Sequence, residues 1–251
     1  MYQMDSFMLT YLSGLESVAE YNIALPITQI IQSLLILPVI FTPIASKMWQ
    51  EKNLAQLKSI TYNASLCLTW IIFPILISLI FLSGDIIKIL ITTKEYAQEA
   101  KYALIILGSG IPLFAIAQFY ITTLNSMEKP AKVAKIVMIG VITNLILNAF
   151  LIPYFNIEGA AFATVGAYLI IAIFAIKTFN KELDFKISPY SIIMIIVFGA
   201  IISYLAFFIG EQVSLWRNIL YAGAAILIYI SLTIYYFIPI IKETFNIIRK
   251  K

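Results

Sequence analysis

The chain has 251 residues, of which 61% are hydrophobic and 12% are charged, and its formal net charge is +4. Soluble domains average roughly 45–50% apolar and 25% charged residues, so this composition excludes a soluble globular protein and indicates an integral membrane protein. The basic residues form short clusters between apolar runs instead of covering one face, which argues against nucleic acid as a partner.

An apolar N-terminal stub is followed by seven apolar runs of about 20 residues, the length that crosses a hydrocarbon layer about 30 Å thick. The stub, residues 1–12, is too short to cross and looks like the end of a helix that begins upstream. Because the runs are continuous and lack the alternation of barrel strands, we expect an all-α, polytopic membrane protein. The predicted spans are 22–46, 58–82, 101–125, 134–154, 157–179, 189–210 and 215–240.

The first span combines prolines with a polar stripe. Gln29 and Gln32 lie three residues apart and so share a helical face. In lipid, such a face lines a water-filled path or forms hydrogen bonds to a neighbouring helix, and we favour cavity lining. Each proline removes an amide donor and crowds the carbonyl four residues earlier, which bends the helix. The expected kinks are at Pro26, Pro38 and Pro43, with a further one at Pro112 in the third span.

The segment 84–101 follows the second span and mixes isoleucines with charged residues. Two interpretations are open for it. It forms an amphipathic stretch that lies at the outer membrane interface, or it is a helical extension of the span before it.

The basic residues alternate between successive loops, and this pattern predicts the topology. One set of loops and the C-terminal tail together hold 13 of the 17 basic residues, whereas the intervening loops hold few. Short loops rich in Lys and Arg stay in the cytoplasm. We therefore expect a multi-pass protein of the cytoplasmic membrane whose C-terminus is cytoplasmic.

Asp5 is the one charged residue that we place inside an apolar stretch. An ionised side chain there costs roughly 2.5–3.5 kcal/mol on insertion scales, so such a residue usually faces a wet cavity. Water access at the start of the chain would explain it equally well. Asn144 and Asn148 share one helical face, and Gln118 shares another with Asn125. These amides are candidates to contact a sugar or a pyrophosphate group, or they pair across helices as packing contacts.

Enzymatic function is disfavoured by what the sequence lacks. It contains no histidine, the commonest metal ligand and the usual general base, and its single cysteine, Cys67, excludes a paired-thiolate metal site. We find no Gly-rich phosphate loop, no G-x-S-x-G elbow and no paired intramembrane carboxylates. We expect a protein that is not an enzyme, without a metal or an organic cofactor, although Na⁺ or H⁺ as a coupling ion stays open.

Three segments resemble the oligosaccharide flippase branch, also called the polysaccharide biosynthesis branch, of the multidrug, oligosaccharidyl-lipid and polysaccharide exporter superfamily. They are MDSFMLTYLSGLESVAEYNIALP at 4–26, TTLNSMEKPAKVAK at 122–135 and NLILNAFLIPYFNIEGAAFAT at 144–164. The middle segment departs from the family, which usually has a glycine at the position of Met127 or Glu128. Asp5 matches an acidic residue common in the seventh helix of the family.

The resemblance implies a transporter of two six-helix lobes around a central cavity, often with two further helices. Residues 1–182 would then form the C-terminal lobe, from the end of helix seven to helix twelve, and residues 183–251 the two additional helices and a cytoplasmic tail. The N-terminal lobe would be missing. The implied activity is flipping of polyprenyl-pyrophosphate-linked oligosaccharide across the membrane for surface polysaccharide biosynthesis.

Two other functions stay open on the sequence. A multidrug or cation antiporter of the same superfamily shares the two-lobe fold. A membrane-embedded polysaccharide polymerase or assembly subunit belongs to a different class, and long outer loops with arginines would favour it. On the side that we place outside the cell, the chain has one arginine, Arg217.

Overall fold

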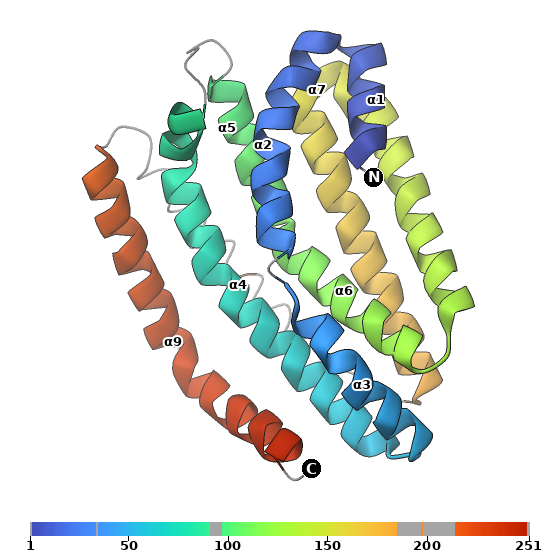
Figure 1. Ribbon diagram of the computed structural model, residues 1–251. Coiled ribbons are helices and arrows are strands. Elements are labelled where there is room, and N and C mark those ends of the chain that lie inside the picture. The colour runs from blue at the N-terminus through green and yellow to red at the C-terminus, as the bar shows by residue number, and fades with distance from the viewer. Residues whose placement is uncertain (1, 34, 91–96, 185–196, 198–213, 250–251) are drawn as a thin grey trace.

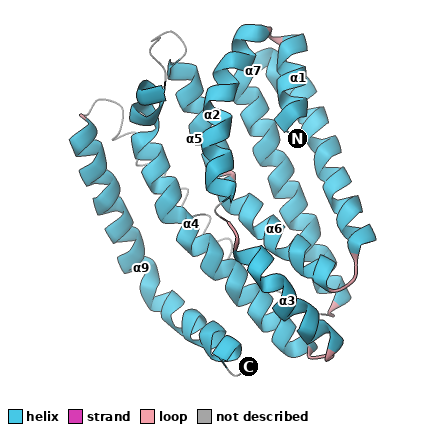
Figure 2. Ribbon diagram, viewed as in Figure 1, coloured by secondary structure: helices cyan, strands magenta, loops and turns pink. Residues whose placement is uncertain are grey.

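The computed structural model describes residues 2–33, 35–90, 97–184, 197 and 214–249. Within these residues the regular structure is helical throughout, which confirms the all-α prediction (Figure 2). Five of the described segments are long and apolar enough to cross a membrane. The predicted span 189–210 lies outside the described residues apart from position 197.

The first predicted span is two helices instead of one bent helix. After α1 (Tyr2–Leu12), the chain turns at Gly14 and α2 runs from Leu15 to Ser33, earlier than predicted. The helix ends there, and a new helix, α3, begins at Leu37 and ends at Gln50. Pro38 explains the break, because a proline lacks the amide that a helix interior needs and is favoured in the first turn of a new helix. Pro26 and Pro43 lie inside α2 and α3.

The next two predicted spans also have different bounds. α4 runs from Leu54 to Leu90, so residues 84–90 continue the helix. For this part of the segment, the helical extension is the correct interpretation, and the separate interfacial stretch is not. Residues 91–96 lie outside the described part of the chain. The third span divides into α5 (Ala97–Ser109) and α6 (Ile111–Ser126), with the division at Gly110. Pro112 stands in the first turn of α6, as Pro38 does in α3.

Two predicted spans lie in one labelled segment, α7 (Pro130–Glu182), which consists of two helices joined at Asn156. Its 53 residues would extend about 80 Å as a straight helix, more than twice the hydrocarbon thickness. Asn156 breaks it with a backbone φ of 45° and ψ of −122°. The two halves, 130–155 and 157–182, fold back on each other and lie side by side (Figure 1). The predicted pair 134–154 and 157–179 is therefore confirmed.

The last described helix, α9 (Leu215–Arg249), packs along α4 (Figure 1). Trp70 of α4 donates its indole N–H to the Thr233 hydroxyl at 2.7 Å, and its ring stacks on Phe237 at 5.1 Å between centroids. These contacts fix α9 to the outside of the bundle. Its opposite face remains exposed, as Tyr235 illustrates at 89%, which suits contact with lipid.

Two hydrophobic clusters hold the helices together. One joins α3, α4, α6, both halves of α7 and α9, and the other joins α1, α2, α4, α5 and the turn of α7. In the second cluster, Gly159 lies so close to the preceding half of α7 that an added Cβ would meet the carbonyl oxygen of Leu151 at 2.5 Å. The turn at Asn156 is thus packed backbone against backbone.

The turn between α6 and α7 contains a residue in an unfavourable backbone conformation. Glu128 has a φ of 60°, a region that L-residues other than asparagine and aspartate rarely adopt and that glycine adopts freely. This is one of the two positions at which we expect the family to carry glycine. Glu128→Gly should therefore stabilise the protein by about 0.5–1 kcal/mol, seen as a raised melting temperature of the purified protein in detergent.

The matched control is Lys135→Gly, because Lys135 is exposed and lies inside a helix of ordinary geometry. That substitution should lower stability by up to about 1 kcal/mol. A lower melting temperature for Glu128→Gly would contradict the assignment of strain to this turn.

Candidate functional site

A fully buried carboxylate lies at the centre of a cluster of polar side chains. Asp5 of α1 is 0% exposed and accepts four hydrogen bonds from neutral side chains. Its Oδ1 accepts from the Asn144 amide at 3.0 Å and the Asn148 amide at 2.7 Å. Its Oδ2 accepts from the Thr164 hydroxyl at 2.7 Å and the Tyr21 hydroxyl at 3.1 Å. We call these five residues the Asp5 cluster.

The fold assembles this cluster from four helical segments. Asn144 and Asn148 lie one turn apart on the 130–155 half of α7, so both amides reach the same side. Thr164 approaches from the other half, and its hydroxyl also accepts from the Asn144 amide at 3.3 Å. Tyr21 arrives from α2. The close packing of the two halves of α7 at Gly159 brings the asparagine face against Thr164.

The donors satisfy the acceptor capacity expected of an ionised carboxylate, which accepts but does not donate. All four partners are neutral, so an ionised Asp5 has no compensating cation among them. One acceptor in the cluster is left over, because Asn148 Oδ1 is buried and has no hydrogen-bond partner in the described part of the chain. A buried polar atom without a partner is costly, and it lies beside an uncompensated charge.

Three of the seven residues predicted to line a cavity thus come together, namely Asp5, Asn144 and Asn148. Sequence reasoning missed Tyr21 and Thr164. Neither belongs to a conspicuous polar stripe of its apolar helix, although Thr164 is the last residue of the motif at 144–164. In this conformation the cluster is closed from solvent, so lining of a cavity by these residues stays a prediction.

The other predicted residues lie apart from the cluster. Gln29 is exposed on α2, and Gln32 is half-buried and donates to the Tyr168 hydroxyl at 3.4 Å. On α6, Gln118 is half-buried and Asn125 is exposed. None of these four is among the donors to Asp5, and their contact with a substrate is untested.

The exposed side of α2 is polar as well as apolar. Residues at helical spacing on this side, Asn22, Pro26, Gln29 and Ser33, are all exposed. The Ser6 hydroxyl of α1 lies 3.5 Å from the Asn22 side-chain oxygen, to which it donates. Neutral amides and hydroxyls are poor neighbours for lipid tails, so this side of α2 suits contact with water, a polar ligand or further protein. We call it the α2 polar face.

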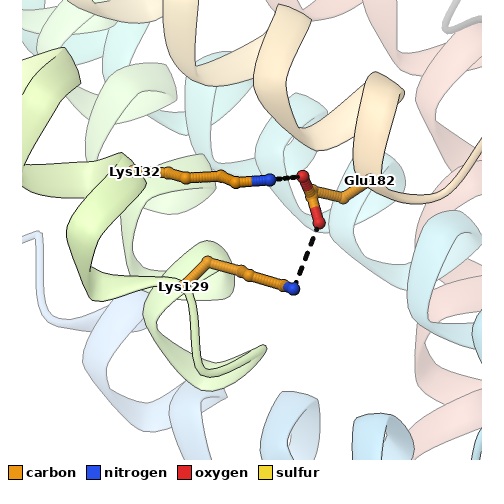
Figure 3. Close-up of polar contacts among 3 residues, drawn as sticks. All are labelled: Lys129, Lys132 and Glu182. Carbon is orange, nitrogen blue, oxygen red and sulfur yellow. Dashed lines mark hydrogen bonds and ion pairs between the residues drawn. The ribbon is translucent and has the colours of Figure 1, made fainter.

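A separate group of charges lies where α6 joins α7. Glu182, at the end of α7, pairs with Lys132 and, at 3.4 Å, with Lys129 (Figure 3). Lys129 also lies 6.0 Å from the centre of the Trp49 ring of α3. These contacts connect both ends of α7 and the end of α3. Within the described residues, no group of three His, Cys, Asp or Glu side chains gathers to hold a metal.

Comparison with known proteins identifies a family and several related proteins. Residues 1–150 match the family described as MatE. A membrane protein of Methanocaldococcus jannaschii, MJ1068, is 31% identical over 201 residues, which cover 78% of this chain and 39% of that protein. The probable low-salt glycan biosynthesis flippase Agl15 of Haloferax volcanii is 29% identical over 49% of this chain and 26% of its own length. The probable flippase AglR of the same organism is 23% identical over 72% and 38%.

Among solved structures, the lipid II flippase MurJ in its inward closed conformation matches 93% of this chain with a TM-score of 0.72. The sequence identity is 18%, so this likeness concerns the fold. The match covers 50% of the MurJ chain. The chain therefore spans half or less of the length of each of these proteins.

Proposed function

Because the chain belongs to the MatE family, we propose that it forms one lobe of a transporter that flips lipid-linked oligosaccharide across the cytoplasmic membrane. The observation that carries this proposal is the shared fold with a lipid II flippase, together with relatives named as glycan biosynthesis flippases. The substrate would be a glycan on a polyprenyl pyrophosphate. This activity is transport, and no bond of the substrate would be made or broken.

A second lobe is needed for this activity. Alternating access requires one lobe to rock against another around a site at their interface. The chain spans about half of MurJ, so we propose that six further helices, the N-terminal lobe, face the α2 polar face. The exposed neutral amides and hydroxyls of the α2 polar face suit sugar hydroxyls, which donate and accept hydrogen bonds and carry no charge. We also propose that the basic loops and the C-terminus lie in the cytoplasm.

We further propose that the Asp5 cluster couples transport to a small cation, Na⁺ or H⁺. The support is the uncompensated carboxylate and the unpartnered Asn148 oxygen beside it. A sodium ion would use both as oxygen ligands. A proton on Asp5 would instead be donated to that amide oxygen. Either ligand would neutralise a charge that is otherwise costly within the membrane.

The test uses proteoliposomes that contain the complete two-lobe protein and a fluorescent polyprenyl-pyrophosphate glycan. Externally added dithionite quenches the label only in the outer leaflet, so the rate of flipping can be followed. We expect the rate to fall at least tenfold in Asp5→Asn. Gln29→Ala should also slow flipping, whereas Ile30→Ala, an exposed apolar neighbour on α2, should not.

The ion is identified by replacing sodium with choline at constant pH, and separately by removing the pH gradient. Unchanged flipping in Asp5→Asn would contradict the coupling role. Movement of a cationic dye without movement of the glycan would contradict the substrate assignment and favour the antiporter.

A further inference from the structure

Tyr21 is the point at which the Asp5 cluster meets α2. Among the residues that donate to Asp5, the other three lie on α7, and Tyr21 comes from α2. Its side chain is fully buried, and its hydroxyl donates to the same oxygen that Thr164 reaches. A buried hydroxyl that loses its acceptor is costly, so the position of α2 depends on what else Asp5 binds.

The structure separates α2 from the helix that follows it. α2 ends at Ser33 and packs mainly on α1, α5 and α7, whereas α3 begins at Leu37 and packs on α4 and α6. Because the two helices have different neighbours, α2 can shift without carrying α3 with it. Within α2, Tyr21 points into the cluster, whereas the next residue, Asn22, is exposed. A shift at Tyr21 is transmitted along the helix to Gln29, about 12 Å further on.

We propose that Tyr21 is a positioning residue that links the state of Asp5 to the α2 polar face. While Asp5 accepts the Tyr21 hydroxyl, α2 is held against α1 and α7. When a ligand of Asp5 replaces that hydroxyl, α2 loses a hydrogen bond to a charged acceptor, which is stronger than one to a neutral group. The α2 polar face then changes its exposure. This inference rests on the proposed function, because it requires that Asp5 binds a ligand during transport.

The experiment follows the rate of maleimide labelling of single cysteines in the full chain, in lipid nanodiscs and with Cys67 replaced by serine. Gln29→Cys reports on α2, while Val39→Cys on α3 and Ile142→Cys on α7 are control reporters, since both positions are exposed. Tyr21→Phe should accelerate labelling of the α2 reporter about fivefold or more, the lower end of typical coupling between sites. The two control reporters should change less than about twofold.

The double-mutant comparison tests the link itself. Asp5→Asn weakens the acceptor of the same hydrogen bond, so it should also accelerate the α2 reporter. Combining it with Tyr21→Phe should add nothing beyond Tyr21→Phe alone, because both changes act on one interaction. Tyr120→Phe is the matched control, since Tyr120 is a fully buried tyrosine of α6 in the other hydrophobic cluster. It should leave the α2 reporter unchanged.

Equal acceleration at all three reporters would indicate general loosening and would overturn the proposal, as would additive effects in the double variant. If Tyr21→Phe does not fold, Asp5→Asn decides the matter: acceleration confined to the α2 reporter supports the link, and no acceleration overturns it. Labelling does not require movement of a glycan. Loss of flipping with an intact labelling response would therefore count against the proposed substrate and not against Tyr21.

Discussion

Gly159→Ala should destabilise the protein by about 3 kcal/mol, the upper end of the range for inserting one carbon into a packed interior. The added Cβ would lie 2.5 Å from the Leu151 carbonyl oxygen, 2.6 Å from its carbon and 2.9 Å from the Ile152 nitrogen. All three atoms belong to the backbone, so no side-chain rotation relieves the clash. The two halves of α7 would have to separate, and the asparagines would move away from Thr164. Thermal unfolding of the purified protein measures the effect.

Gly223→Ala provides the control for this prediction. Gly223 lies in α9, and a Cβ added there meets no atom within 4 Å. Alanine has a higher helix propensity than glycine, so this substitution should raise stability by roughly 0.5–1 kcal/mol. Equal stabilities of Gly159→Ala and Gly223→Ala would contradict the close packing of the backbone at the Asn156 turn.

Asn148→Ala should be the most damaging single truncation within the Asp5 cluster. It removes the shortest amide donor to the Asp5 carboxylate, at 2.7 Å, and hydrogen bonds to charged groups contribute roughly 1.5–3 kcal/mol. The buried Asp5 carboxylate would lose a donor that favours its ionised form. We therefore expect a loss of stability of about 2–3 kcal/mol, measured by thermal unfolding in detergent, and slower flipping in proteoliposomes.

Asn125→Ala is the matched control, because Asn125 is an exposed asparagine near the end of α6. A substitution at such a surface position usually changes stability by less than about 0.5 kcal/mol. Equal stabilities of the two variants would show that the Asn148 amide does not support Asp5.

Much of the fold could be predicted from the sequence, because crossing a membrane imposes a length and an apolar composition that are readable without knowledge of packing. The turn between the halves of α7 was predicted within a residue or two, since Asn156 follows Pro153 between two apolar runs. The break at Pro38 was predicted only as a bend. Near Gly110, only a bend at Pro112 was predicted. A proline that bends a helix and a proline that begins a new one have the same local sequence, and packing decides between them.

The candidate site was only partly predictable for a related reason. Asp5, Asn144 and Asn148 are conspicuous because strongly polar side chains are rare in apolar spans. Tyr21 and Thr164 are ordinary residues of membrane helices, and nothing local distinguishes the ones that point at a carboxylate. Their roles depend on how α1, α2 and the two halves of α7 meet, which is a property of the tertiary structure.

The Asp5 cluster also has a consequence for the order in which the protein is assembled. Asp5 belongs to the first helix of this chain, yet the amide of Asn144 that supports it is encoded 139 positions later. At roughly 5–20 residues per second, ribosomes take about 7–28 seconds to synthesise that interval. During this time α1 carries a carboxylate whose later partners do not yet exist. We therefore expect the nascent α1 to keep Asp5 near water, an insertion factor or the translocation channel until α7 has been synthesised.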